Sequence, residues 1–275
     1  IGVGLVGSEM CIRDSNGSYK EGDTISITVS LSEAVDVTGT PTLTLGTGND
    51  ATYTSGTGSD TLTFTYTVQD GDTTSDLDFN ATDSLSGTLK DTALNNATLT
   101  LVTPGASGSL AANKELVLDT TAPTITNVTA STDNGSYKED DIITITVSLS
   151  EAVDVTGTPT LTLGTGNDAT YTSGSGSDTL TFTYTVQAGD TTSDLDYNAT
   201  GSLSGTLKDT ALNDATLTLV TPGDTGSLAA NKALVLDTTA PTITDVTATT
   251  DDGSYKAGDT INITVSLSEA VDVTG

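Results

Sequence analysis

Apolar and polar residues alternate strictly along several segments of this chain. In residues 61–68 every even-numbered residue is apolar and every odd-numbered residue is threonine. Successive side chains of a β-strand point to opposite faces, so a period of two predicts a strand with one buried face and excludes an amphipathic helix. The same alternation predicts strands over 25–31, 42–45 and 98–101.

Turn-forming clusters separate these strands, at 46–50, 55–60 and 69–72. Seven to nine short strands in roughly 110 residues predict an all-β immunoglobulin-like β-sandwich, with a closed barrel as the alternative. Between the turns, Thr suits the solvated face of an antiparallel sheet because it is β-branched and soluble. The predicted core of residues 120–237 is Ile143, Ile145, Val147, Leu161, Leu163, Leu180, Phe182, Tyr184, Val186 and Leu236.

An internal repeat of domain length runs through the chain. The sequence Asn-Gly-Ser-Tyr-Lys at Asn16 recurs at Asn134, and as Asp-Gly-Ser-Tyr-Lys at Asp252, which gives a period of 118 residues (134 − 16). Residues 16–133 and 134–251 differ at 13 positions. A segment of this length can bury its own core, so we expect tandem domains in an extended array.

The predicted domain boundaries lie at Leu118-Asp-Thr-Thr-Ala-Pro-Thr124 and at its copy, 236–242. Pro123 and Pro241 fix φ and hold the preceding residue extended, so the linker should be short and stiff. The expected units are a first unit without its first strand, a complete second unit and an incomplete third unit, at 16–119, 120–237 and 238–275. We expect the natural protein to be a longer array.

Residues 1–15 stand outside this pattern. Met10, Cys11 and Arg13 are the only residues of their types and fall within four consecutive positions. The segment Gly4–Asp14 resembles a transposon-end sequencing adapter translated in one frame. We therefore interpret 1–15 as a non-native, adapter-derived segment. The rival interpretation, a signal peptide, lacks a basic start and has too short an apolar run.

Composition excludes several functions. The chain has no His and a single Cys, so it cannot form a Ser-His-Asp or Cys-His arrangement or a His-ligated metal centre, and we expect no enzyme. Its formal net charge of −29 repels phosphate backbones, so we expect no nucleic-acid partner. No run of eighteen apolar residues occurs, so we expect no membrane span.

Three motifs carry a family resemblance. They are the Asp-Thr-Thr-Ala-Pro link, the Gly-Asp-Thr-Ile and Ser-Glu-Ala-Val run (22–25 and 32–35) and the strand at 61–68. Together they resemble the bacterial immunoglobulin-like repeats of large secreted adhesins, over residues 16–275. The resemblance implies secretion to the bacterial cell surface, a role in long stalks, and calcium between domains. Relatives often have Asp-x-Ala-Gly-Asn where this chain has Asp209-Thr-Ala-Leu-Asn213, with Leu in place of Gly.

Carboxylates converge at the predicted junctions. Most of the 37 Asp and Glu residues fit solvated turns on an acidic surface. However, the last strand of one unit should end beside two loops of the next unit, and calcium takes six to eight oxygen ligands. The candidate Ca²⁺ ligands are Asp119, Glu151, Asp154, Asp209 and Asn213 at the first junction, and Asp237, Glu269 and Asp272 at the second.

The expected function is mechanical. We predict an extracellular spacer in a large bacterial adhesin or surface-fibre protein, whose partners are neighbouring repeats of the same chain. Host or surface glycans would bind through regions outside this chain. The alternative is that the repeats themselves bind glycan or matrix; near-identical copies favour the spacer.

Overall fold

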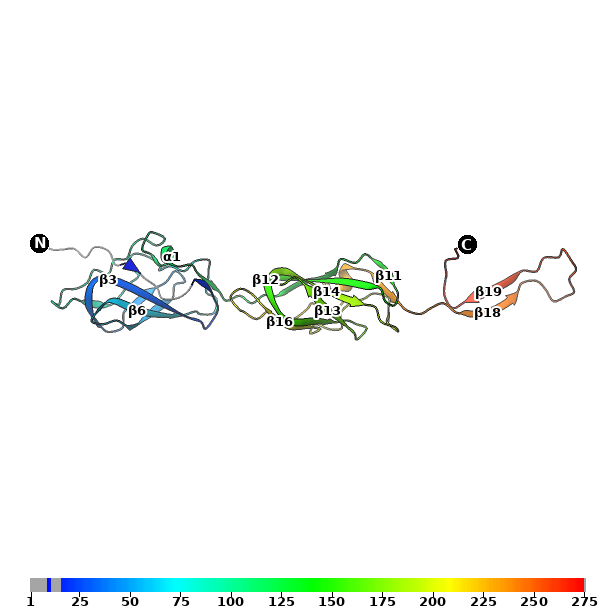
Figure 1. The fold of residues 1–275 in the computed structure, drawn as a ribbon, viewed down its shortest axis with the longest axis horizontal. Coiled ribbons are helices and arrows are strands. Elements are labelled where there is room, and N and C mark those ends of the chain that lie inside the picture. Colours follow the sequence, from blue (N-terminus) through cyan, green and yellow to red (C-terminus); the bar gives the residue numbers. More distant parts are fainter. Residues whose placement is uncertain (1–8, 11–15, 275) are drawn as a thin grey trace.

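A computed structural model describes residues 9–10 and 16–274, and they are predominantly β-structure. Figure 1 shows an extended molecule in which the first, second and third units follow one another along the long axis. No helix of the described residues is long and apolar enough to cross a membrane.

Each of the first two units contains short strands, one long strand and one four-residue helix. Residues 9–119 form β1 (Glu9–Met10), β2 (Gly17–Tyr19), β3 (Thr24–Thr38), β4 (Thr42–Thr44), β5 (Asp50–Ser55), β6 (Ser59–Thr67), β7 (Thr73–Thr74), β8 (Thr88–Lys90), α1 (Leu110–Asn113) and β9 (Leu116–Asp119). Residues 125–237 form β10 (Ile125–Ala130), β11 (Gly135–Tyr137), β12 (Ile142–Thr162), β13 (Asp168–Ser173), β14 (Ser177–Thr185), β15 (Thr191–Thr192), β16 (Leu203–Lys208), α2 (Leu228–Asn231) and β17 (Leu234–Asp237). The third unit contains β18 (Ile243–Ala248) and β19 (Ile263–Leu267).

Two sheets enclose one hydrophobic core in the second unit. The larger sheet joins β10, β12, β13 and β14, with β16 also paired to β12, and the smaller sheet has the order β11-β17-β15. The core takes Val147 and Phe182 from the larger sheet and Leu234 and Leu236 from the smaller one. Alternation along the strands therefore directs one face of each sheet into a shared interior.

The predicted core is confirmed. All ten residues expected in the interior of the second unit are at most 2% exposed. The threonines between them lie on the outer face, where Thr146 opposes Thr181 and Thr144 opposes Thr183. This arrangement keeps a β-branched residue at nearly every strand position without burying its hydroxyl.

The strand predicted over 98–101 is wrong. Residues 97–100 belong to no strand, although Leu101 is buried. Leu101 N–H donates to the Thr82 carbonyl in a loop, and no neighbouring strand runs alongside. Alternating burial therefore arises here from an extended loop that lies over the core, which the period-two pattern cannot distinguish from a strand.

Strand β1 occupies the place that β10 has in the second unit. Its register is Glu9↔Ser30 and Met10↔Val29, and the residues 118 positions later are Asn127↔Ser148 and Val128↔Val147. Ladder hydrogen bonds use backbone groups, so an unrelated extended segment can fill this edge. The rest of the segment interpreted as adapter-derived, 1–8 and 11–15, lies outside the described residues.

The third unit has only the strand pair that corresponds to β10 and β12. Ile263 and Val265 are 68% and 50% exposed, whereas the matching Ile145 and Val147 are fully buried. The second unit covers that face with β11, β17 and the loops around them, and residues 238–274 contain no such elements. The difference shows that burial depends on the whole unit.

Phe182→Ala should destabilise the second unit by about 3–5 kcal/mol, since the ring is fully buried and packs edge-on against Tyr171. Urea denaturation of the full chain would measure the loss as one of two separated transitions. A cost below about 1 kcal/mol would show that this strand does not form the core.

Tyr197→Phe should cost the second unit about 1 kcal/mol. The Tyr197 hydroxyl donates to the Val220 carbonyl at 2.8 Å, and burial, followed by the charges of Asp196 and Asp224, raises its pKa to about 12. The first unit has Phe79 at this position, so Phe79→Tyr is the reciprocal variant and should recover a bond. Equal melting temperatures for Tyr197→Phe and the parent would contradict this account.

Candidate metal site at the junction of the first two units

The linker is attached to the first unit by one threonine. Thr120 Oγ1 donates to the Asp72 carbonyl at 3.2 Å and accepts a hydrogen bond from Gly71 N at 3.1 Å. Thr238 makes the same two bonds, to Asp190 and from Gly189, at 3.1 and 3.0 Å. In both linkers, therefore, the chain is held to the preceding unit immediately after its last strand.

The following residues of the linker are attached to the second unit. Thr124 N donates to Ser150 Oγ at 3.0 Å, and Ser150 N donates back to the Thr124 carbonyl at 2.8 Å. Thr216 N donates to the Pro123 carbonyl at 2.8 Å. Only Thr121 and Ala122 separate the two sets of attachments, which agrees with the predicted short, stiff linker.

Three carboxylates meet where these attachments end. Asp119 closes β9 of the first unit, Glu151 lies in β12, and Asp209 directly follows β16. One carboxylate oxygen of each lies within 4.8 Å of the others. Glu151 falls within the register shift between Ser148 and Val153, and such an irregularity turns a side chain away from the regular alternation.

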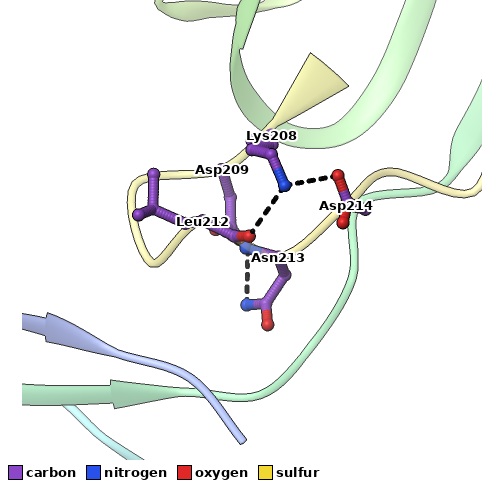
Figure 2. Close-up of polar contacts among 5 residues, drawn as sticks. All are labelled: Lys208, Asp209, Leu212, Asn213 and Asp214. Carbon is purple, nitrogen blue, oxygen red and sulfur yellow. Dashed lines mark hydrogen bonds and ion pairs between the residues drawn. The ribbon is translucent and has the colours of Figure 1, made fainter. Parts of the chain in front are cut away.

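A tight turn fastens Asp209 to the first unit through Asn213. Asn213 donates from its backbone N to Asp209 Oδ1 at 2.9 Å and from Nδ2 to Asp209 Oδ2 at 2.8 Å. Its Nδ2 also donates to the Asp119 carbonyl at 2.8 Å. Figure 2 shows this turn, with the Leu212 side chain on its outer side. Asn213 thus joins two of the three acidic residues as a hydrogen-bond donor.

Leu212 occupies the position at which the resembling family usually has Gly. Its φ is 69°, in the left-handed region, and its side chain is 60% exposed. Leu94, its counterpart in the first unit, has the same φ. The turn therefore keeps its geometry with Leu, at a backbone cost of about 1–2 kcal/mol.

The neighbouring lysine neutralises a different carboxylate. Lys208 Nζ bonds to Asp214 Oδ1, and Figure 2 shows it between Asp214 and the turn. Its bond with Lys208 lowers the pKa of the Asp214 carboxyl, and the charge of Lys20, in the first unit, adds to this. Within residues 16–274, no ion pair joins a lysine to Asp119, Glu151 or Asp209.

Uncompensated charge is visible at Glu151. Its pKa is raised, first because burial removes the carboxyl from water and then because Asp119 and Asp209 place like charges beside it. At the second junction, the matching Glu269 has an Oε1 that is buried and has no hydrogen-bond partner among the described residues. Both observations indicate acidic groups that lack a counter-charge.

The residues present fit a hard divalent cation. Three carboxylates offer oxygen ligands, which Ca²⁺ and Mg²⁺ prefer, and the cluster has neither the thiolate nor the imidazole that softer metals select. Asp119 Oδ1 accepts from Thr121 N at 3.0 Å, which fixes the carboxylate and leaves its second oxygen for a ligand. Asp119, Glu151 and Asp209 are therefore the residues that would hold the ion.

The other predicted ligands lie differently. Asp154 is exposed in β12, opposite Lys208, and does not belong to the group of three. At the second junction Asp237 Oδ1 accepts from Thr239 N at 3.0 Å, as Asp119 does from Thr121, while Asp272 is exposed. The third unit contains no counterpart of Asp209 within residues 238–274.

Sequence reasoning missed the residues that position this cluster. Thr120 and Ser150 do so by hydrogen bonds that join segments 26 to 49 residues apart. Their exact recurrence at Thr238 and Ser268 was the available signal, but most Thr and Ser residues recur equally well.

No model of a known protein family matches this chain. No curated protein is similar to it in sequence either. Its function must therefore be inferred from the chemistry of its own residues.

Glu151→Gln should remove a pH dependence that is present when divalent ions are chelated. Because the folded-state pKa of Glu151 lies above its usual 4.5, its stabilising contribution is complete below that pH and is lost as pH rises through the raised pKa. At neutral pH the variant should therefore be more stable than the parent, by less than about 1 kcal/mol because the group is partly exposed.

Urea denaturation of the full chain with chelator, from about pH 4 to pH 8, would measure this effect. Asp154→Asn is the matched control, since it removes a nearby exposed charge outside the cluster. Identical pH profiles for Glu151→Gln and the parent would refute the repulsion.

Proposed function

We propose that this chain is an extracellular spacer, built of tandem immunoglobulin-like β-sandwich domains, in a large bacterial adhesin or surface-fibre protein. The observation that carries the proposal is the double attachment of each linker. Thr120 bonds to the unit before it and Thr124 to the unit after it, and the second linker repeats both attachments at Thr238 and Thr242. Such joints keep successive domains end to end, which a spacer requires and an independent binding module does not.

The architecture of the second unit supports the sandwich assignment. Two separate sheets cover a single core, most strand pairs are antiparallel, and short turns join β12, β13 and β14. These are properties of immunoglobulin-like domains. The 13 differences between the first two copies leave the buried apolar positions unchanged except for Phe79/Tyr197.

Calcium completes the proposed spacer. Asp119 comes from one unit and Glu151 and Asp209 from the next, so an ion bound by all three would couple the units directly. A chain with a formal net charge of −29 repels itself along its length, and a cation at each junction offsets this repulsion where carboxylates are closest. At the second junction Asp237 and Glu269 would take the same roles.

Direct recognition of glycan or matrix by these units is the less supported alternative. Binding surfaces are enriched in exposed aromatic side chains. Among the described residues with large exposed apolar side chains, Tyr255 is the only aromatic. We therefore place ligand binding in other regions of an adhesin and assign these units a non-enzymatic role on the bacterial surface.

Calcium should raise the melting temperature of the chain and stiffen it. An ion that binds only the folded state stabilises it by RT ln(1 + [L]/Kd), about 2.7 kcal/mol at a hundredfold excess over Kd. Calorimetry would measure stability, and small-angle scattering would measure the maximum dimension, each with calcium and with chelator.

Asp209→Asn should abolish both responses, and Asp154→Asn should preserve them. Asp209→Asn keeps the shape of the side chain and removes one charge of the cluster. If neither quantity responds to calcium in the parent, the cluster is surface charge and the hydrogen-bonded linker alone accounts for stiffness.

A further inference from the structure

The first and last strands of the smaller sheet run side by side in the second unit. Strand β11 pairs in parallel with β17, with the register Gly135↔Leu234, Ser136↔Val235 and Tyr137↔Leu236. Strands β2 and β9 make the same parallel pair in the first unit. The segment by which the chain enters each unit is therefore bonded directly to the segment by which it leaves.

Further hydrogen bonds extend this pairing toward the start of the unit. They join residues 128–135, near the point of entry, to residues 226–233, just before β17. They are Val128 N to Gly226 O (2.9 Å), Asn231 Nδ2 to Val128 O (2.7 Å), Lys232 Nζ to Thr132 O (2.9 Å), Ala233 N to Asn134 Oδ1 (3.1 Å) and Gly135 N to Ala233 O (3.0 Å).

The direction of the pairing determines how tension reaches these bonds. The chain is pulled backward through β10 and β11 from Thr124 and forward through β17 from Asp237. In a parallel pair these pulls act along the strands in opposite directions, so every bond between them is stretched at once. An antiparallel terminal pair would instead open from one end, one bond at a time.

We propose that this terminal clamp, defined as residues 128–137 bonded to residues 226–237, sets the resistance of each unit to mechanical unfolding. The clamp deepens the proposed spacer function, because only a chain under tension makes use of it. Forced unfolding is governed by the unfolding rate, so bonds broken at the first step matter more than their share of total stability. The core behind the clamp remains intact until the clamp shears.

Gly135 offers a matched pair of variants. Gly135→Pro removes the N–H that bonds to Ala233, whereas Gly135→Ala keeps it. A Cβ at this position meets no atom closer than 3.9 Å, so alanine fits without displacement. The first unit stays unchanged in both variants and serves as the reference within each molecule.

The experiment tethers the full chain at its two ends and measures the lifetime of each unit at constant force. In Gly135→Pro, one of the two unfolding events should come about fivefold or more sooner than in the parent, the factor that one lost hydrogen bond produces. Gly135→Ala should match the parent. Tyr171→Phe, which removes the acceptor for Ser175 N at the β13–β14 turn, should leave the lifetime unchanged because this turn lies outside the clamp.

Asn231→Ala decides the case in which Gly135→Pro prevents folding. It removes an exposed side chain that bonds to Val128, and it too should shorten one lifetime. Parental lifetimes in both Gly135→Pro and Asn231→Ala, or an equal loss in Tyr171→Phe, would overturn the clamp. Because these measurements are made with chelator, they stand apart from the calcium response that tests the spacer.

Discussion

Parallel pairing between the first and last strands of the smaller sheet is the constraint on which the rest of this structure depends. Because β11 and β17 run in the same direction, the chain enters the second unit at one pole and leaves at the other. Successive units must then follow one another along an axis, and the end of one unit must meet the loops that open the next. The junction cluster and the path of tension both result from this arrangement.

A buried polar network supports the attachment of each linker. The Asp72 carboxylate accepts from the Tyr66 hydroxyl, from Asn49 Nδ2 at 3.0 Å and from Gln69 N at 2.8 Å, and its carbonyl accepts from Thr120. Burial and the bond to Asp72 raise the pKa of Tyr66, so the phenol remains a donor. The linker is thus fastened to a rigid turn, which transmits orientation better than a loose loop would.

At the junction two kinds of interaction act in opposite directions. Hydrogen bonds from Thr120, Ser150 and Asn213 hold the units together, while Asp119, Glu151 and Asp209 repel one another. The raised pKa of Glu151 expresses that repulsion. A cation would convert the repulsive group into a third attachment, and the junction would then respond to the ionic composition outside the cell.

The sequence by itself determined the strand-forming segments, the identity of the core and the position of the boundaries, because alternation and exact repetition are local signals. It also placed Asp119, Glu151 and Asp209 near one another, since each ends or interrupts a strand at the same pole. Only the tertiary structure separated Asp154 from them and made Asn213 a donor, because one strand irregularity and one left-handed Leu212 set those directions. The parallel closure by β11 and β17 likewise joins residues about a hundred positions apart, and nothing local in either short segment specifies its partner.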